Sequence, residues 1–403
     1  MTESTSADLP AHDAISNRMR RVISSIGHFE SWAMDPELNA GLARPDVSDF
    51  VFGNPHDLAS PDYVAALIEA TRPTGPHHFA YTFNHPPATQ AISAGLRARF
   101  GLDFDPEDVS LTSGNFAGLS VTLRLLVDPG DEVIFISPPW FFYEAMIVDS
   151  GATPVRVHSL PPAFDLPVET IRAALTPRTR AIIVNSPQNP TGRIYPAEDL
   201  AALAEVLGLA ARQHGRRIYL LSDEAYSRIV FGGRAVPTPL AYYPDSFLLY
   251  TYGKTLLAPG SRLGYIAISP TMVGREGIRS ALLAAQMMNG WAFPTAPLQY
   301  ALPALETMSI DVSVLERRRD LLVSTLLSQG YELIVPEGTF YITVRSPIAD
   351  DMAFAQMLIE ERIYVLPGAM FELPGWFRLS VTASDDMVAR ALPGFERAMK
   401  RVR

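Results

Sequence analysis

The chain contains no cysteine and almost no lysine. Without cysteine it cannot form disulfides, use a thiol in catalysis or build a cysteine-ligated zinc site. The absence of cysteine is also typical of a protein that works in a reducing compartment, so we expect it in the cytoplasm.

Long hydrophobic runs and an excess of positive charge are missing as well. No apolar run approaches the roughly 20 residues that span a bilayer. Residues Met1 to Ala11 hold acidic and hydroxyl side chains rather than the apolar stretch of a secretion signal. A net charge of -10 and a pI near 5.3 argue against nucleic acid or an anionic membrane as a partner. We therefore expect a protein that acts on small molecules and has no nucleic-acid or membrane partner.

The scarcity of lysine makes one position stand out. Lys254 and Lys400 are the only lysines, and every other cationic side chain is an arginine. Lysine can lose its proton and attack a carbonyl to form a Schiff base, which arginine cannot do. Lys254 follows the apolar run Ser246 to Tyr250, so it is placed just beyond a buried strand. A surface lysine without a role would fit this single observation equally well.

Strands and helices alternate between Val109 and Ile268, which predicts an α/β fold with a mostly parallel sheet flanked by helices. Such sheets bind ligands beyond the carboxyl ends of their strands. Unusual residues follow five predicted strands at that edge. They are Thr112 to Asn115, Trp140, Asn189, Asp223 and Lys254.

The pattern becomes α+β after Leu282 and predicts a smaller second domain. Thr307 to Ser328 is predicted as a helix with Glu316 and the arginines 317–319 facing outward, and Tyr331 to Val344 as a strand. We expect three segments: an N-terminal arm with a small-domain segment (1–48), a large cofactor-binding domain (49–285) and a small C-terminal domain (286–403).

Four motifs in this order resemble the class I/II aminotransferases, which are pyridoxal-phosphate enzymes of fold type I. The motifs are Asn189-Pro190-Thr191-Gly192, Asp223-Glu224-Ala225-Tyr226, Lys254 with Arg262 and Gly264-Tyr265, and Phe377-Arg378-Leu379-Ser380. The resemblance covers roughly Gly53 to Ser380.

The resemblance implies roles around the cofactor ring. Lys254 would hold the cofactor aldehyde as a Schiff base and move a proton. Asp223 would pair with the pyridine nitrogen, and Asn189 and Tyr226 would donate hydrogen bonds to the ring oxygen. Trp140 would stack on the ring. An ordinary helix cap at Asp223 and a core or interface aromatic at Trp140 are the competing interpretations.

It also implies roles for the cofactor phosphate and the substrate. Backbone N–H groups of Gly114, Asn115 and Phe116 at a helix start, together with Thr251 and Arg262, would bind the phosphate.

Arg378 would bind the substrate α-carboxylate, assisted by Asn189 and by a close backbone approach at Gly53. A solvated strand arginine is the competing interpretation of Arg378.

The resemblance further implies a homodimer with shared active sites. Tyr81 would reach the phosphate in the neighbouring subunit, and Thr295 could do the same. Cis peptide bonds are expected at Ser137-Pro138 and Asn189-Pro190. The loop histidines 77, 78 and 85 lack an accompanying acidic ligand, so no metal site is expected.

The expected activity is transfer of an amino group between an α-amino acid and a 2-oxo acid. The same residues would equally serve β- or γ-elimination, replacement or Cα oxidation. A cofactor-sensing transcription regulator would need a DNA-binding module, for which residues 1–48 are too short.

The preferred substrate stays open. Some dicarboxylate-using relatives carry a lysine where Phe116 stands, which disfavours aspartate and glutamate by that route. The aromatics Trp32, Phe83, Trp291 and Tyr341 could line an apolar side-chain pocket or belong to the core.

Overall fold

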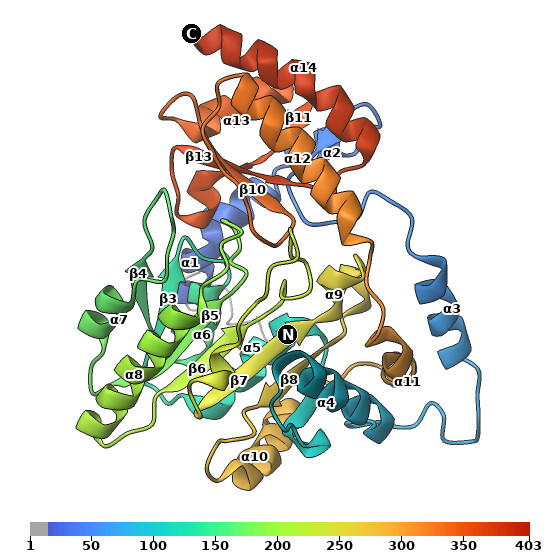
Figure 1. Cartoon of the computed structure of the whole chain (residues 1–403), viewed down its shortest axis with the longest axis vertical. Coiled ribbons are helices and arrows are strands. Elements are labelled where there is room, and N and C mark those ends of the chain that lie inside the picture. Colours follow the sequence, from blue (N-terminus) through green and yellow to red (C-terminus); the bar gives the residue numbers. More distant parts are fainter. Residues whose placement is uncertain (1–14) are drawn as a thin grey trace, which may run out of the picture.

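The computed structural model describes residues 15–403, which contain a seven-stranded sheet, a four-stranded sheet and a two-stranded pair, with helices around them (Figure 1). The expectation for Met1 to Ala11 lies outside the described residues. The seven-stranded sheet has the order β2-β8-β7-β6-β5-β3-β4, and only β8 runs antiparallel to its neighbours. Its strands are β2 (Val109–Thr112), β3 (Glu132–Ser137), β4 (Thr153–His158), β5 (Thr179–Asn185), β6 (Tyr219–Asp223), β7 (Ser246–Thr251) and β8 (Gly264–Ile268).

Helices cover both faces of this sheet, which explains why its central strands are buried along their whole length rather than at alternate residues. Alternate residues of β3 belong to different cores. Val133 and Phe135 pack with α5, α6 and α10, whereas Ile134 and Ile136 pack with α7 and α8. A third core lies beneath α3, α4 and α11. The helices are α3 (Pro61–Ala70), α4 (Pro86–Phe100), α5 (Gly114–Leu126), α6 (Tyr143–Ser150), α7 (Val168–Ala174), α8 (Ala197–His214), α10 (Arg275–Met288) and α11 (Ala296–Leu305).

A smaller antiparallel sheet, in the order β12-β13-β10-β9, lies above the large one in Figure 1. Its strands are β9 (Leu333–Ile334), β10 (Tyr341–Arg345), β12 (Leu366–Pro367) and β13 (Trp376–Ser380), and its helices are α12 (Val312–Ser328), α13 (Asp351–Glu360) and α14 (Asp385–Val402). The fold class expected from the sequence is confirmed.

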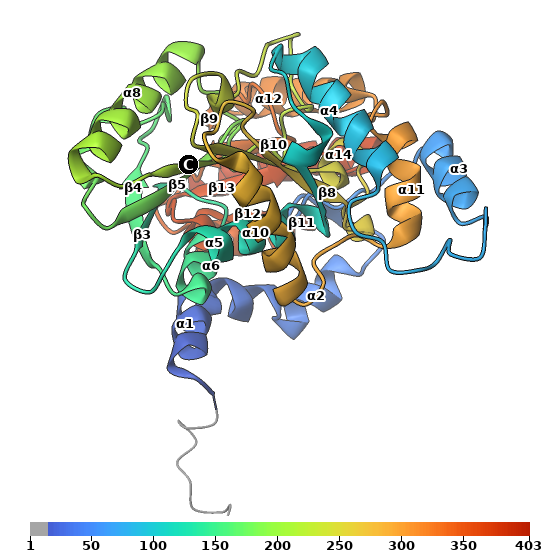
Figure 2. The ribbon, with the colours of Figure 1, turned by 90° about the horizontal axis from the view of Figure 1, so that it is seen from below.

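The N-terminal segment joins both parts of the molecule. Strand β1 (Ser48–Asp49) pairs with β11 (Ile363–Tyr364) beside the small sheet, and α2 (Pro36–Leu42) precedes it. Helix α1 (Asn17–Ala33) contacts α6 at the edge of the molecule (Figure 2). The boundaries at residues 48/49 and 285/286 stay predictions. Among the helices of residues 15–403, none combines the length and apolar character of a membrane span.

Three expectations for the C-terminal part were wrong. Helix α12 begins at Val312 rather than Thr307, because Asp311 caps it with its side chain. The strand expected over Tyr331 to Val344 is split into β9 and β10 by the stretch around Pro336 and Gly338.

The arginines of α12 also do not all face outward, because Arg318 and Arg319 are buried. Arg318 donates hydrogen bonds to Asp385 at 2.6 Å and to Asp57 at 2.7 Å. These bonds join three segments that are far apart in the sequence. A helical periodicity alone cannot reveal them, because it does not show where acidic partners will lie.

Because Arg318 is buried and Arg317 is exposed, replacing each of them with alanine should lower the free energy of unfolding by different amounts. Arg318→Ala should lower the free energy of unfolding by about 2 to 3 kcal/mol, because two charge-assisted hydrogen bonds are lost. Arg317→Ala, on the exposed side of α12, should change it by less than about 0.5 kcal/mol. Urea denaturation of both variants checks this, and equal losses would contradict the assigned burial.

A second buried charge lies directly after β6. Glu224 accepts hydrogen bonds from Ser222 at 3.0 Å and from Thr238 at 2.7 Å, while its Oε2 has no partner among the described residues. Burial raises the pKa of Glu224 from 4.5 to about 7. Between these values the folded protein keeps a proton that the unfolded chain has released, so stability falls as the pH rises.

Glu224→Gln should remove this pH dependence. Relative to the parent protein, the variant should gain about 3 kcal/mol of unfolding free energy between pH 4.5 and pH 8. Denaturation at several pH values measures the difference. Glu198→Gln, at an exposed position of α8, is the control and should run parallel to the parent. A Glu224→Gln profile that also runs parallel would refute the raised pKa.

Candidate active site

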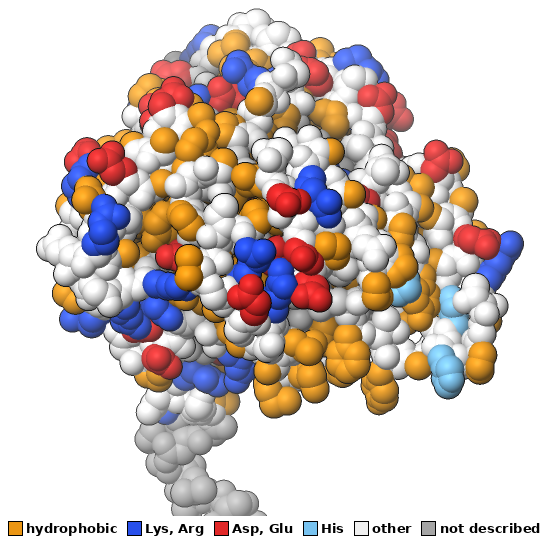
Figure 3. Space-filling view, turned by 60° about the horizontal axis from the view of Figure 1, so that its bottom comes forward, with side chains coloured by type: hydrophobic (Ala, Val, Ile, Leu, Met, Phe, Trp, Pro, Cys, Tyr) orange, Lys and Arg blue, Asp and Glu red, His pale blue; other side chains and the backbone are white. Residues whose placement is uncertain are grey.

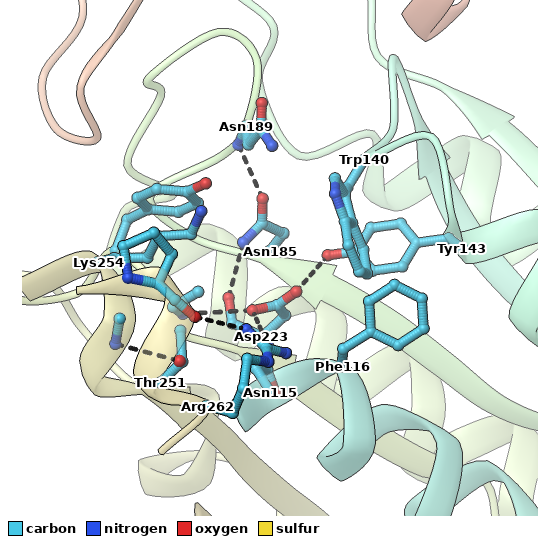
Figure 4. Close-up of a pocket in the computed structure, with 14 residues that line it drawn as sticks. Asn115, Phe116, Trp140, Tyr143, Asn185, Asn189, Asp223, Thr251, Lys254 and Arg262 are labelled. Carbon is cyan, nitrogen blue, oxygen red and sulfur yellow. Dashed lines mark hydrogen bonds between the residues drawn. The ribbon is translucent and has the colours of Figure 1, made fainter. Parts of the chain in front are cut away.

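One cavity lies at the carboxyl ends of the parallel strands, where the sequence placed its unusual residues (Figure 4). The residues around it come from the ends of β3, β5, β6 and β7 and from the start of α5. Its lining is Asn115, Phe116, Trp140, Tyr143, Asn185, Asn189, Asp223, Ala225, Tyr226, Thr251, Gly253, Lys254, Pro259 and Arg262. Nine of the predicted site residues are therefore brought together.

Asp223 is the most constrained group in the cavity. Its carboxylate accepts hydrogen bonds from the Tyr143 hydroxyl at 2.5 Å, the Asn115 side chain at 2.7 Å and the Ala225 backbone N–H at 3.2 Å. Burial raises the pKa of Asp223, while these donors and the charge of Lys254 act in the opposite direction. The carboxylate is thus fixed in orientation and still faces the cavity (Figure 4).

Lys254 lies in α9 (Tyr252–Thr255), a single turn that directly follows β7. Thr251 caps this turn by accepting a hydrogen bond from the Gly253 N–H at 3.3 Å. The Lys254 Nζ lies 5.6 Å from the ring centroids of Tyr226 and Phe340. No carboxylate within residues 15–403 forms an ion pair with Lys254. Its amine is therefore free to react with a ligand in the cavity.

The start of α5 forms a cradle for an anion. Gly114 has a φ of +79°, and a Cβ there would lie 2.8 Å from a terminal nitrogen of Arg262. The positive φ favours glycine here, and the absence of a side chain leaves room for this guanidinium. The unpaired N–H groups of the first turn of α5 and the Arg262 side chain can bind a phosphate together. Thr251 lines the same cavity.

Arg378 lies behind the lining rather than in it. It donates hydrogen bonds to the Asn189 Oδ1 at 2.8 Å and to the Val51 carbonyl at 3.1 Å, and its guanidinium carbon lies 3.7 Å from the Tyr341 ring centroid. Its Nε is buried without a partner among the described residues. A carboxylate that enters beside Asn189 would meet this free donor.

Gly53 lets the chain approach this arginine closely. A Cβ at Gly53 would lie 2.3 Å from the Phe340 ring and 2.9 Å from the Tyr341 hydroxyl. Val51, which accepts from Arg378, is two residues earlier in the same segment. The glycine is thus required by packing next to the arginine.

Aromatic rings form the outer wall of the cavity. Phe116 and Trp140 lie edge to face with centroids 5.2 Å apart, and Phe142 lies 5.2 Å from each of them. Phe116 remains 40% exposed. Figure 4 shows Trp140 and Phe116 on the side of the cavity opposite Lys254.

Tyr81, another predicted site residue, lies on the surface and is not part of the lining of this cavity. It is 88% exposed and contacts Trp291, with ring centroids 5.3 Å apart. Thr295, the N-cap of α11, lies in the same surface region. The peptide bonds Ser137-Pro138 and Asn189-Pro190 are cis, as expected.

Two residues of the site were missed from the sequence. Tyr143 donates to Asp223, and Asn185 donates from its side chain to the Asp223 carbonyl at 2.8 Å. Asn185 also accepts a hydrogen bond from the Asn189 N–H at 2.7 Å. Asn185 could have been found, since it ends β5 at the same edge of the sheet. Tyr143 does not lie at the end of a strand, and its hydrogen bond to Asp223 depends on how α6 is oriented against the sheet.

The chain is similar to known proteins of one family. The model of the family "Aminotransferase class I and II" matches residues 45–394. The aspartate/prephenate aminotransferase of Thermus thermophilus is 33% identical over 368 residues, covering 88% of this chain and 92% of the relative. The aspartate aminotransferase of Thermotoga maritima is 30% identical, covering 93% and 98%.

Solved structures agree over nearly the whole length. An amino transferase from Eubacterium rectale has a TM-score of 0.85 at 26% identity and covers 97% of each chain. The Thermus thermophilus aspartate aminotransferase with maleate has a TM-score of 0.79 at 30% identity, covering 95% of this chain and 99% of that one. The chain therefore belongs to the class I and II aminotransferases, a family of pyridoxal-phosphate-dependent enzymes.

Proposed function

We propose that this enzyme moves an amino group between an α-amino acid and a 2-oxo acid, with Lys254 as the residue that carries the cofactor through a Schiff base. The main support is the pairing of an unengaged amine at Lys254 with a fixed, buried carboxylate at Asp223 in one cavity. Pyridoxal phosphate supplies an aldehyde that reacts with amines and a ring that accepts the electron pair left on the substrate carbon.

The donor and acceptor groups around the cavity match the chemistry of this cofactor. Asp223 offers an acceptor to a protonated ring nitrogen, and Tyr143 and Asn115 hold it in place. Because Asn189 accepts from Arg378 through Oδ1, its Nδ2 remains to donate to the ring oxygen. The Tyr226 hydroxyl, which hydrogen-bonds with Tyr341 in this structure, would turn to the same oxygen when the cofactor binds.

The remaining cofactor contacts follow from the same cavity. Trp140 packs against the ring and excludes water from one face. The backbone N–H groups of Gly114, Asn115 and Phe116, with Thr251 and Arg262, bind the phosphate. In this assignment Asn115 has two functions, since its side chain also orients Asp223.

The substrate is oriented by Arg378, which binds its α-carboxylate. The free Nε supports a two-point contact, with Asn189 and the Gly53 segment limiting where the carboxylate can sit. Lys254 lines the same cavity as Asn189, the hydrogen-bond partner of Arg378. The Lys254 Nζ then removes the α-proton and returns a proton to the cofactor side of the site.

We further propose that the enzyme is a homodimer in which Tyr81 reaches the phosphate of the neighbouring subunit. Tyr81 is highly exposed and lies away from its own cavity, which supports a role in a second one. Large apolar side chains around it are also exposed, namely Phe79, Phe83, Met287, Met288 and Trp291. The cytoplasmic location stays a prediction of the sequence.

The two lysines of the chain provide a direct test with a built-in control. Lys254→Ala should lower turnover by at least about 10³-fold, because both the attachment point and the proton carrier are lost. Borohydride reduction of the holoenzyme should trap the cofactor on the peptide that contains Lys254. Lys400→Ala removes an exposed lysine paired with Glu396 and should change neither result.

The holoenzyme also distinguishes amino-group transfer from the other reactions that this cofactor supports. An amino donor added alone should convert the bound cofactor to its amine form, which visible absorbance follows. Full turnover or full trapping in the Lys254→Ala protein would refute the assignment of this residue. Donor breakdown without formation of the amine form would refute amino-group transfer.

A further inference from the structure

Each positively charged side chain in or beside the cavity already has a role in the proposed function. Lys254 and Arg262 are the only cationic side chains among the residues that line it, and Arg378 lies behind Asn189. These three serve the cofactor aldehyde, the cofactor phosphate and the substrate α-carboxylate. Within residues 15–403, the lining therefore holds no cation for a second carboxylate on the substrate.

The arginines of the neighbouring hollow do not fill this gap. Arg18 and Arg124 line that hollow, which shares Phe116 with the cavity. Arg18 lies 3.7 Å from Asp149, and Arg124 donates a hydrogen bond to Asn289 at 2.9 Å. Both guanidinium groups thus have partners that line this hollow rather than the cavity. The wall that faces the substrate is formed by the rings of Phe116 and Trp140.

A second group of aromatic side chains lies on the surface around Tyr81. Trp291 contacts Tyr81, Phe83 and Phe293, with ring centroids between 5.1 and 5.3 Å apart. Trp291 has a φ of +66°, which is unusual for a bulky residue and costs on the order of 1 kcal/mol or more. The fold nevertheless keeps this ring 37% exposed.

This surface carries no charge. The hollow beside Tyr81 is lined by residues 79–82, 291 and 293–297, and none of them is acidic or basic. Figure 3 shows hydrophobic side chains gathered along the lower edge of this side of the molecule. Because Trp291 packs on Tyr81, a dimer that brings Tyr81 to the partner's phosphate also brings Trp291 to the mouth of that cavity.

We propose that the substrate side chain binds in an uncharged aromatic pocket made by Phe116 and Trp140 of one subunit and Trp291 of the partner subunit. The preferred amino donors then carry large apolar or aromatic side chains, unlike the aspartate named for the relatives. This inference rests on the proposed function and on its homodimer. An aromatic side chain of the substrate would bind more tightly by packing against these rings. A carboxylate in the same pocket would lose its hydration and find no cation to pair with.

The holoenzyme tests the preference in single turnovers. The rate at which phenylalanine, leucine, alanine, aspartate and glutamate each convert the cofactor to its amine form is followed by visible absorbance. Phenylalanine should exceed aspartate by at least about 100-fold in rate constant over dissociation constant. Aspartate equal to or faster than phenylalanine would overturn the inference. Failure of every donor would instead refute the proposed function.

Variants identify the residues that recognise the side chain. Trp291→Ala should lower the ratio of the phenylalanine rate to the alanine rate by about 10- to 100-fold. Phe79→Ala removes a more exposed ring of the same surface and should leave that ratio unchanged. Phe116→Arg should shift the preference towards aspartate by supplying the missing cation. An unchanged ratio in Trp291→Ala, or an unchanged preference in Phe116→Arg, would overturn the assignment.

Hybrid dimers show which subunit supplies the tryptophan. One chain carries Lys254→Ala and the other carries Trp291→Ala, so only the second chain has a reactive lysine. If Trp291 acts across the interface, that site receives an intact Trp291 and regains the parent's selectivity. Selectivity as low as in the Trp291→Ala homodimer, or a monomeric active holoenzyme, would overturn the shared pocket.

Discussion

The site depends on a single buried carboxylate whose position is set by three separate segments. Asp223 ends β6, and it is held by Tyr143 from α6, Asn115 from α5 and the N–H of Ala225. Burial raises the pKa of Asp223 and so disfavours the charged form, while the donors act in the opposite direction. A ligand that presents a positively charged N–H to Asp223 would offset the remaining cost of burying its charge. A buried carboxylate is therefore tolerated at this position.

The rest of the cavity follows from where the strands end. Four neighbouring parallel strands deliver Trp140, Asn189, Asp223 and Lys254 to one edge of the sheet, while the antiparallel β8 lies between β2 and β7. The small sheet adds Arg378 from β13. The hydrogen bond between Arg378 and Asn189 joins the two parts of the molecule beside the cavity. Asp223 and Lys254 lie in regular elements, whereas Trp140 and Asn189 lie in short segments just beyond the ends of β3 and β5.

Much of this arrangement was accessible from the sequence, because strand ends are marked by apolar runs followed by turn residues. The same logic placed Lys254 after β7 and Asp223 at the end of β6, and their proximity followed from a parallel sheet. Side-chain partners across the fold were not accessible. Tyr143 lies on a helix whose orientation no local pattern specifies, and Arg318 becomes buried only because Asp57 and Asp385 meet it in space.

The most direct test of this account concerns the proton on the cofactor's ring nitrogen. The holoenzyme is prepared with ring-¹⁵N-labelled pyridoxal phosphate, and the ¹⁵N chemical shift is measured across the neutral pH range. The account predicts a protonated nitrogen in the parent protein and in Glu224→Gln, and a neutral nitrogen in Asp223→Ala. A neutral nitrogen in the parent, or a protonated one that persists in Asp223→Ala, would contradict the role assigned to Asp223.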